Sequence, residues 1–512
     1  MSGFRVHRVN RPTSLRGSNG VALGPDGRLY VAQFLAGQIS AVDPASGQVE
    51  VIVPADGPVQ TPDDLAFASD GSMYIVDTVP GRVWRRFPDG TFRLISEDVR
   101  LPNGIACAGG RLFVNEMTRD GRLLELREDE TVVLTGGLAL GNAMQLGPDG
   151  YLYYPHMLTG EVHRIFPDGG TPELVADHVH EPVAVRFDLA GTLLVLSRGA
   201  EGIVTRVDLH GSGDRSLIVS GISGLDNAAF DSENRMFVTS YATGGLFELH
   251  PGGRTREIAP HGLTGPYGVT IDLGGTVHVA DHYRLVRPQS PDEDVATTEL
   301  LRFVHGVAAD GGLLHLTSQY GQVSTYDQTT RAVRIRAADL DQPLGIAVRA
   351  DGVLVVAESG AGRVLTIGHD DTVTVIAEAL GRPVDVAVHE GVCYVSDEDR
   401  GAVYRIDDGV PAVLLDGLDT PQGLAVSDGR LFVLEAGRHQ LVSVDPHTGE
   451  HRATTDVPSA GTAPRELPAL SVHGLPGVPR PFAGLAAAPD GSLYLAADGE
   501  GGILHLTPVE TP

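Results

Sequence analysis

The chain of 512 residues contains no lysine, so each of its 38 basic residues is an arginine. This absence excludes mechanisms that need a Schiff-base lysine or the lysine of a phosphate-binding loop. Cysteine is scarce as well, and the two that occur, Cys107 and Cys393, are too far apart in the chain to indicate a disulfide framework. Positive charge is outnumbered by 66 acidic residues, which gives a formal net charge of −28 and argues against nucleic-acid binding.

Long hydrophobic runs are also missing. The first five residues, Met1 to Arg5, lead directly into strand-like sequence, with neither an apolar leader nor a membrane-spanning stretch. We therefore expect a cytoplasmic protein that acts on a small molecule and contacts no membrane, and its oligomeric state stays open. The sequence likewise lacks a nucleophile elbow, a glycine-rich loop before a helix, and zinc-binding CxxC or HExxH spacing.

What the sequence does contain is one phrase repeated twelve times. Its clearest copy runs from Asn19 to Gln33 and includes the turn Pro25-Asp26-Gly27. If Asn19 is taken as an anchor, equivalent positions fall at 19, 63, 103, 142, 183, 226, 267, 305, 344, 384, 422 and 483. A period of about 40–50 residues with several short strands per unit is typical of a β-propeller blade.

These repeats predict an all-β protein made of two tandem propellers, each with six four-stranded blades, because propellers typically have about 4–8 blades. Residues 11–258 form propeller 1 (blades 1–6), and residues 259–512 form propeller 2 (blades 7–12). The last blade ends after its third strand, whereas Phe4 to Val9 precedes blade 1 and has no partner. Because an open sheet edge is a liability, we expect residues 1–10 to supply the closing strand of blade 12. The role of the 456–482 insertion is left open.

Polar residues gather at one predicted mouth of propeller 1. Each anchor begins the innermost strand of its blade, so the six anchors form an inner ring at one end of the channel. This ring consists of Asn19, Asp63, Asn103, Asn142, Val183 and Asp226, with Asn227 beside it. Oxygen ligands at this density favour a hard divalent cation such as Ca²⁺, Mg²⁺ or Mn²⁺. The alternative is that each residue only ties its own loop by side-chain hydrogen bonds.

Propeller 2 is an internal control for that pattern. Its inner ring is Tyr267, His305, Leu344, Val384, Gln422 and Ala483. If the fold itself required Asn or Asp at this position, both rings would contain them. The difference favours a metal or polar-ligand site in propeller 1.

An outer ring is expected around the first, because the second strand of each blade returns to the same mouth. In propeller 1 it consists of Gln33, Asp77, Glu116, His156, Ser197 and Ser240, with Arg198 and Tyr241 alongside. His156 is the expected general acid or base, and Glu116 could orient it or replace it. Arg198 could anchor a substrate carboxylate or phosphate, and Gln33, Asp77, Ser240 and Tyr241 are further candidate substrate contacts. A structural role for Asp77 stays open.

Three phrases resemble the regucalcin/gluconolactonase superfamily: Leu101 to Ala106, Gly141 to Gly150, and Gly224 to Asp231. The Asp226-Asn227 pair, followed by Asp231, is similar to metal-site blades of paraoxonases and gluconolactonases. The repeat also resembles NHL-type blades and the propeller of virginiamycin B lyase. The resemblance covers blades 1–6, and blades 7–12 only as a generic repeat.

The resemblance implies six-bladed propellers that hold one catalytic divalent metal at the channel mouth and open lactones or related esters. By matching, Asp226 takes the place of the family's metal-binding Asp, and Asn103 and Asn142 match its Asn positions. The chain departs from the pattern at Val183, where the family has Asn, and at Asn19, where it has Glu. Asp63 supplies a carboxylate from another side of the ring.

The leading hypothesis is therefore a metal-assisted hydrolase of propeller 1 that acts on a lactone or ester. A lyase or intramolecular cyclase of small-molecule metabolism could use the same site. The third reading is a non-enzymatic binding scaffold, since a fold does not determine a function.

Overall fold

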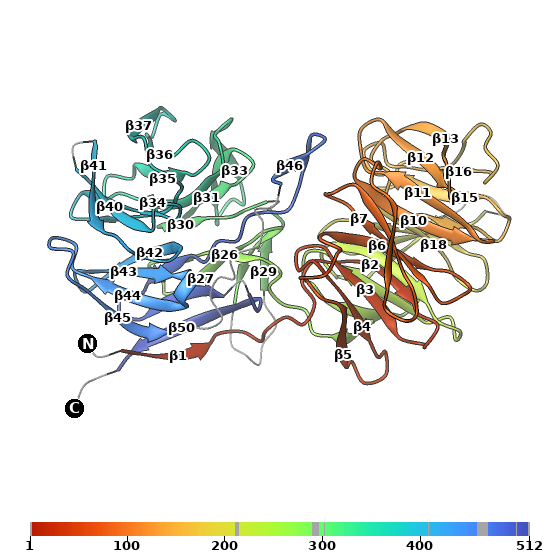
Figure 1. The fold of residues 1–512 in the computed structure, drawn as a ribbon, viewed down its shortest axis with the longest axis horizontal. Helices are drawn as coiled ribbons and strands as arrows, with labels where there is room; N and C mark the ends of the chain where they lie inside the picture. The colour runs from red at the N-terminus through yellow and green to blue at the C-terminus, as the bar shows by residue number, and fades with distance from the viewer. Residues whose placement is uncertain are drawn as a thin grey trace. The chain divides into compact units, whose positions relative to one another are not determined.

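The structure, a computed structural model, describes residues 3–209, 215–288, 296–301, 303–407, 409–457, 469–497 and 499–509. Within these residues the chain forms twelve four-stranded antiparallel sheets, as the repeat predicts (Figure 1). They fall into two compact units. One comprises Thr13–Thr264 with Ser471–Val478, and the other comprises Met1–Pro12, Gly265–Leu470 and Pro479–Pro512. We call these units propeller 1 and propeller 2.

Each blade of propeller 1 is one continuous stretch of chain, and its strands follow from the channel outward. Blades 1 to 3 are β2 (Ser18–Leu23), β3 (Leu29–Gln33), β4 (Gln38–Val42) and β5 (Val49–Val53); β6 (Pro62–Phe67), β7 (Met73–Asp77), β8 (Arg82–Arg86) and β9 (Phe92–Ser96); and β10 (Pro102–Ala108), β11 (Arg111–Glu116), β12 (Gly121–Leu126) and β13 (Thr131–Leu138). Blades 4 to 6 are β14 (Gln145–Leu146), β15 (Leu152–His156), β16 (Glu161–Ile165) and β17 (Glu173–Ala176); β18 (Pro182–Phe187), β19 (Leu193–Ser197), β20 (Ile203–Val207) and β21 (Arg215–Val219); and β22 (Leu225–Phe230), β23 (Met236–Ser240), β24 (Leu246–Leu249) and β25 (Thr255–Ala259).

Propeller 2 repeats this order in its first five blades. Blades 7 to 9 are β26 (Pro266–Ile271), β27 (Val277–Asp281), β28 (Arg284–Arg287) and β29 (Ala296–Glu299); β30 (Val307–Asp310), β31 (Leu313–Ser318), β32 (Gln322–Asp327) and β33 (Val333–Ala337); and β34 (Pro343–Val348), β35 (Leu354–Glu358), β36 (Arg363–Ile367) and β37 (Val373–Ala377). Blades 10 and 11 are β38 (Pro383–His389), β39 (Val392–Asp397), β40 (Ala402–Asp407) and β41 (Val410–Leu415); and β42 (Pro421–Ser427), β43 (Arg430–Glu435), β44 (Gln440–Val444) and β45 (His451–Asp456).

Blade 12 is built from both ends of the chain, which confirms the predicted closure. Its strands are β48 (Leu485–Ala487), β49 (Leu493–Ala497), β50 (Gly502–Pro508) and the N-terminal β1 (Phe4–Arg8). In register, Phe4 pairs with Pro508 and Arg8 with Leu504. The ring of Phe4 also packs edge-on against Phe432 of blade 11, with centroids 5.5 Å apart.

Short elements outside the blades complete the described chain. They are the 3₁₀ turn η1 (Ala436–Arg438) and the hairpin β46 (Ser471–Val472) with β47 (Leu475–Pro476). Within the 456–482 insertion, residues 458–468 lie outside the described part. No helical segment of the described chain reaches the length and hydrophobicity that a bilayer crossing requires.

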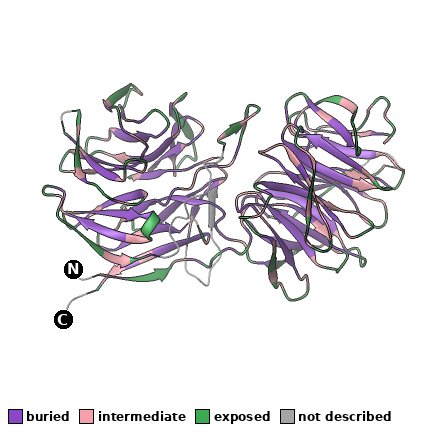
Figure 2. Ribbon diagram, viewed as in Figure 1, coloured by how far each residue is buried: buried purple, intermediate pink, exposed green. Residues whose placement is uncertain are grey.

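The blades pack through alternating apolar side chains, as a two-residue strand period requires. The first strands of the six blades contact one another in a closed ring in each propeller: β2, β6, β10, β14, β18 and β22 in one, and β26, β30, β34, β38, β42 and β48 in the other. Figure 2 shows that inner strands are buried, whereas the outermost strands carry much of the exposed surface.

Asp-Gly turns connect the first and second strands in blades 1, 2, 4, 8, 9, 11 and 12. In blade 1, Asp26 accepts a hydrogen bond from the backbone N–H of Arg28 (3.2 Å), and Gly27 has a φ of 80°. Glycine is suited to that left-handed backbone because it lacks a Cβ. These short turns make the strand ends of different blades equivalent, and so place the anchor residues at one end of each channel.

Candidate functional site

The anchors of propeller 1 lie at the start of its inner strands and are withdrawn from solvent. Asp63 is 5% exposed, Asn103 3%, Asn142 6% and Asp226 8%. Asn19 is half-buried, and its Nδ2 donates a long hydrogen bond to Oδ1 of Asp63 (3.5 Å). Two carboxylates therefore lie in a ring of amides with little access to bulk water.

These two carboxylates disfavour each other's ionised form. Burial, together with the charge of Asp64, raises the pKa of Asp63 to about 7. Burial and the charges of Asp63 and Asp64 also raise the pKa of Asp226 well above its usual range. Nearby positive charge from Arg198 opposes this shift only in part. Such a pair is stabilised by a cation, because like charges at low dielectric repel strongly.

Two amide oxygens beside these carboxylates have no partner among the described residues. Oδ1 of Asn19 and Oδ1 of Asn103 are buried and accept no hydrogen bond, whereas Nδ2 of Asn103 contacts the sulfur of Met117 (3.2 Å). A buried polar atom without a partner is costly. Carboxylate and amide oxygens are the donors that Ca²⁺, Mg²⁺ and Mn²⁺ prefer, so these residues fit a hard divalent cation.

Asn142 contributes less to this donor set than its position predicts. Its Oδ1 accepts a hydrogen bond from the backbone N–H of Ala143 (2.8 Å), and its carbonyl oxygen accepts one from Nδ2 of Asn115 (2.6 Å). The side chain therefore ties the shortened inner strand of blade 4, with one lone pair of Oδ1 left.

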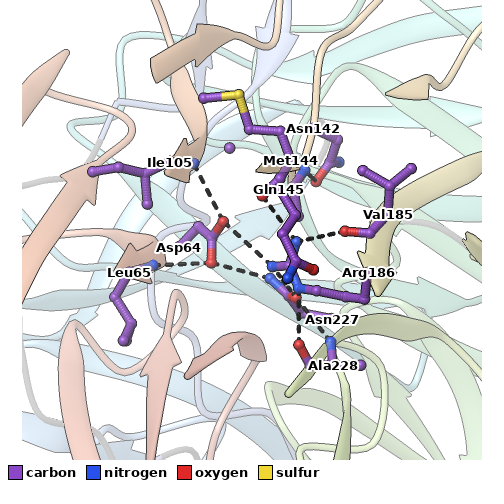
Figure 3. Close-up of polar contacts among 12 residues, drawn as sticks. Asp64, Leu65, Ile105, Asn142, Met144, Gln145, Val185, Arg186, Asn227 and Ala228 are labelled. Carbon is purple, nitrogen blue, oxygen red and sulfur yellow. Dashed lines mark hydrogen bonds and ion pairs between the residues drawn. The ribbon is translucent and has the colours of Figure 1, made fainter. Parts of the chain in front are cut away.

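Asn227 is not positioned as a metal ligand, which corrects the expectation from its place beside Asp226. Its Oδ1 accepts hydrogen bonds from the backbone N–H of Ala228 (2.8 Å) and from Nη2 of Arg186 (2.5 Å). Its Nδ2 donates to Oδ1 of Asp64 (3.1 Å). Figure 3 shows these contacts converging on Arg186.

Arg186 was not among the candidate residues, yet its guanidinium group lies in the channel of propeller 1. It donates to the carbonyl oxygens of Ala228 (2.8 Å), Met144 (3.0 Å) and Val185 (2.8 Å), and its Nη2 is 3.8 Å from Oδ2 of Asp64 (Figure 3). The sequence could have pointed to Arg186, because most of the equivalent positions in the other blades of propeller 1 are alanine. Those are Ala22, Ala66, Ala106 and Ala229, with Gln145 in blade 4.

The outer-ring residues are the last residues of their second strands, as predicted. Most of their side chains, however, hydrogen-bond to backbone groups of their own blade; we call such a residue a clasp. Gln33 accepts from the backbone N–H of Arg16 (2.9 Å) and donates to Oγ of Ser40 (2.8 Å). Asp77 accepts from the backbone N–H groups of Gln60 (3.1 Å) and Thr61 (2.7 Å). These bonds favour a structural role for both side chains, and their assignment to substrate binding stays a prediction.

Ser240 is a third clasp, and propeller 2 uses the same position in the same way. The hydroxyl of Ser240 donates to the carbonyl of Ser223 (2.7 Å) and accepts from the N–H of Thr243 (3.0 Å). In propeller 2 the equivalent carboxylates accept from backbone N–H groups about sixteen residues earlier: Asp281 from Gly265, Glu358 from Asp341, Asp397 from Gly381 and Arg382, and Glu435 from Asp419. The clasp is thus a property of the blade, not of a site.

Glu116 is the most tightly held clasp of propeller 1. It accepts from Arg100 (Nη2, 2.7 Å) and from Arg122 (Nε, 2.9 Å), and its side chain is fully buried. Burial raises the pKa of Glu116, but the hydrogen bonds from Arg122 and Arg100 outweigh it and lower the pKa to about 2. This corrects its assignment as a catalytic residue.

His156 departs from the clasp pattern. Its Nε2 is buried without a partner among the described residues, and its ring stacks on that of His163, with centroids 4.4 Å apart. Burial and the neighbouring His163 lower the pKa of His156 to about 4, so the imidazole is neutral at pH 7. With Glu161, these two histidines offer three donor atoms within 4.8 Å of one another. This cluster is a second place where a divalent metal could bind.

The remaining expected residues lie on blades 5 and 6. The guanidinium carbon of Arg198 is 4.7 Å from the ring centroid of Tyr241, and Nη1 of Arg198 contacts the sulfur of Met157 (3.8 Å). The hydroxyl of Ser197 is buried without a hydrogen-bond partner in the described chain. The positive charge of Arg198 favours the ionised form of Asp226.

Comparison with known proteins finds a match to a gluconolactonase from Zymomonas mobilis subsp. mobilis, 32% identical over 232 residues. The match covers 38% of this chain and 64% of the relative, so the chain spans less than two thirds of that protein's length. It confirms the resemblance to gluconolactonases predicted from the motifs. No family model matches the chain.

Two solved structures are similar at lower identity. A streptogramin B lyase is 17% identical, with a TM-score of 0.40, and the alignment covers 58% of this chain and 98% of that one. A chain of a nidogen/laminin complex is 17% identical, with a TM-score of 0.41, and the alignment covers 46% of this chain and 93% of that one.

Proposed function

We propose that propeller 1 is a divalent-metal-assisted enzyme that opens a lactone or related ester of a small molecule at its polar mouth. One observation carries the proposal: Asp63 and Asp226, both buried and mutually destabilised as anions, lie in a ring with the unpartnered amide oxygens of Asn19 and Asn103. The partial match to a gluconolactonase supports the reaction class.

The residues that would hold the cation are Asp63, Asp226, Asn19 and Asn103, with Asn142 able to offer its remaining lone pair. A bound divalent cation polarises the carbonyl oxygen of an ester and stabilises negative charge that develops there. The carboxylate pair fixes the total charge of the site close to neutral once such an ion is present.

Two further side chains complete the proposed chemistry. Neutral His156, with Nε2 unpartnered, can accept a hydrogen bond from water and take up a proton as the water attacks. Arg198, stacked on Tyr241, supplies positive charge for a carboxylate or phosphate on the substrate.

A lyase or cyclase reaction remains the second candidate. It uses the same parts, because a cation that polarises a carbonyl also acidifies the neighbouring C–H bond, from which a base can remove the proton. The choice between the two reactions depends on the substrate, so a screen needs lactones and lyase substrates side by side.

The first experiment follows thermal unfolding of chelator-stripped protein by the fluorescence of Trp84, the single tryptophan of the chain, which lies in blade 2 of propeller 1. Adding Ca²⁺, Mg²⁺ or Mn²⁺ is expected to stabilise propeller 1 by about 2.7 kcal/mol at a hundredfold excess over Kd. Asp226→Asn should remove that gain and, with it, lactone opening measured by acid release.

Two control variants locate the ion. Asp77→Asn alters a buried clasp carboxylate of blade 2 outside the ring, so it should keep the metal-linked gain; because Asp77 accepts from Nε1 of Trp84 (3.3 Å), this variant is followed by calorimetry. His163→Ala removes a donor of the His156 cluster only. If His163→Ala abolishes the gain and Asp226→Asn does not, the ion binds at blade 4 and the proposal for the mouth fails. No gain with any cation has the same consequence, and the site is then a binding scaffold or a metal-free one.

A further inference from the structure

The channel of propeller 2 contains a cavity of about 260 Å³ that the proposed function does not use. One position in each of the six inner strands keeps it open, because each carries a small residue there. These residues are Thr270, Ala308, Ala347, Ala387, Ala425 and Ala486. Phe482, 2% exposed, also lines the cavity, whereas Thr270 and Val348 are half-buried. The volume suits a small organic group, since liquid water takes about 30 Å³ per molecule.

One carboxylate, Asp385, lines this cavity and has no cationic partner. Its Oδ1 accepts from the backbone N–H of Val386 (2.9 Å) and its Oδ2 from that of Leu424 (2.8 Å). Among the described residues it forms no ion pair, although it is only 6% exposed. Burial raises the pKa of Asp385 to about 7. A buried carboxylate without a counter-charge is unusual.

Propeller 1 shows what the equivalent carboxylate binds. Asp64 occupies the same position in blade 2, and its oxygens accept from the backbone N–H of Leu65 (2.9 Å) and of Ile105 (3.4 Å) in the next blade. There, Oδ1 of Asp64 also accepts from Nδ2 of Asn227 (3.1 Å), and Nη2 of Arg186 lies 3.8 Å from Oδ2 of Asp64, at ion-pair distance (Figure 3). Asp64 and Asp385 thus accept the same two kinds of backbone hydrogen bond, but only Asp64 has a guanidinium group nearby.

The position in propeller 2 that is equivalent to Arg186 follows from the order of the blades. Arg186 lies three blades after Asp64, and three blades after Asp385, around the ring, the equivalent residue is Thr270. The residues whose carbonyls accept from Arg186 are Val185, Ala228 and Met144. Their counterparts in propeller 2 are Val269, Val307 and Leu485, and all three line the cavity. Propeller 2 therefore keeps these three carbonyls, but it has Gly306 in place of Asn227, whose Oδ1 also accepts from Arg186, and a much shorter side chain in place of the arginine.

We propose that the channel of propeller 2 binds a small molecule with a guanidinium head group, with Asp385 as its counter-ion in the place that Asp64 has beside Arg186. The head group would donate to Asp385 and to the carbonyls of Val269, Val307 and Leu485. The cavity, at about 260 Å³, is smaller than the usual ligand pocket of about 300–1,000 Å³, so the ligand is a short alkylguanidine. This site is independent of the proposed chemistry of propeller 1.

The test uses methylguanidinium as the probe and N-methylurea, its neutral counterpart of the same shape, as the control ligand. Binding to the full chain is measured by calorimetry and by ligand-observed NMR. We expect methylguanidinium to bind and N-methylurea to bind at least tenfold more weakly. Equal binding of the two compounds, or binding of neither, would overturn the proposal and leave a water-filled channel.

Three variants sharpen the result. Asp385→Asn keeps an acceptor for one backbone N–H but removes the charge, so it should weaken methylguanidinium binding at least tenfold. Thr270→Arg places a tethered guanidinium in the channel and should abolish binding. Asp351→Asn alters an exposed turn of the same propeller and should leave binding unchanged. Unchanged binding in Asp385→Asn contradicts the proposal.

A reciprocal variant tests the same idea in propeller 1. Arg186→Ala opens the channel beside Asp64, and methylguanidinium should then raise the urea-unfolding midpoint reported by Trp84. The parent protein, whose channel already holds Arg186, should show no such rise. If Arg186→Ala does not fold, the Asp385→Asn and Thr270→Arg comparison in propeller 2 still decides the proposal.

Discussion

The two propellers share one backbone plan and differ in what fills their channels. Propeller 1 places the guanidinium of Arg186 beside Asp64 and brings Asp63, Asp226 and two unpartnered amide oxygens together at its mouth. Propeller 2 has alanine or threonine along its channel and a lone buried carboxylate, Asp385. The blade backbone therefore fixes where side chains point, whereas a few sequence differences between the propellers decide which charges meet there.

The mouths differ as much as the channels. In propeller 2 the anchors include Tyr267 and His305, whose rings pack with centroids 4.3 Å apart, and Phe482 stacks beside them. Burial and the nearby His282 lower the pKa of His305 well below its usual range, so this ring is neutral. These anchors carry no carboxylate, and the charges beside them, Arg382 and Glu398, are paired with each other. This supports confining the proposed metal chemistry to propeller 1.

The largest effect should come from breaking the closure of propeller 2 alone. Deleting residues 1–9 removes β1 from blade 12, together with the buried ring of Phe4, whose loss alone is worth about 3–5 kcal/mol. Propeller 1 needs no strand from elsewhere, so its transition, reported by Trp84, should stay in place. Calorimetry should show a second transition that moves to much lower temperature. A parallel fall of the Trp84 transition would mean that the propellers unfold as one unit.

A smaller effect is expected from pH on metal-free propeller 1. The folded-state pKa of Asp63 is raised to about 7, from an ordinary value near 3.8, and that of Asp226 is raised as well. The native state therefore binds protons more tightly than the unfolded state, and stability is lost as pH rises between these values, by on the order of a few kcal/mol. Urea unfolding followed by Trp84 at pH 4.5, 6 and 7.5, values chosen to span about this range, measures the slope.

The same experiment has a clear control. Asp226→Asn removes one of the two repelling carboxylates, so its metal-free stability should depend less on pH than that of the parent. A saturating divalent cation should flatten the profile of the parent but not that of the variant. A parent profile that rises with pH over this range would contradict the raised pKa values.

The smallest expected effect concerns Glu116. Glu116→Gln leaves Arg100 and Arg122 without a carboxylate, but both guanidinium groups are partly exposed, so the loss should be about 1–2 kcal/mol. The metal-linked stabilisation of propeller 1 should persist, because Glu116 is a clasp and not part of the ring. Urea titration with and without Mn²⁺ checks both points, and loss of the Mn²⁺ effect would restore Glu116 to the site.

Much of the fold was predictable, because each copy of the repeat places its strands at the same positions relative to the anchor residue. The ends of the second strands fall at Gln33, Asp77, Glu116 and His156, which are the positions that the repeated phrase predicts. The pairing of β1 with β50 followed from counting strands. These features depend on local pattern and on the need to cover sheet edges, both of which the sequence displays.

The candidate site was predictable only in part. The ring positions of Asp63, Asn103 and Asp226 follow from the register, and the structure buries all three. Their neighbours do not follow, because Glu116 is neutralised by Arg100, and Asn227 is taken up by Arg186. The sequence pattern of a polar residue at a strand end is the same whether its side chain faces a ligand or the backbone of its own blade.

The number of blades, their division into two rings, the closing strand and the polar bias of one mouth follow from the repeat pattern alone. Which of those polar groups remain unpartnered depends on contacts that form when the rings close. The reason is physical: partners such as Asp64 and Asn227, separated by 163 residues, meet only when the ring closes. Whether a buried carboxylate has a counter-charge then depends on the residue across the channel. Asp64 has Arg186 there, whereas Asp385 has Thr270.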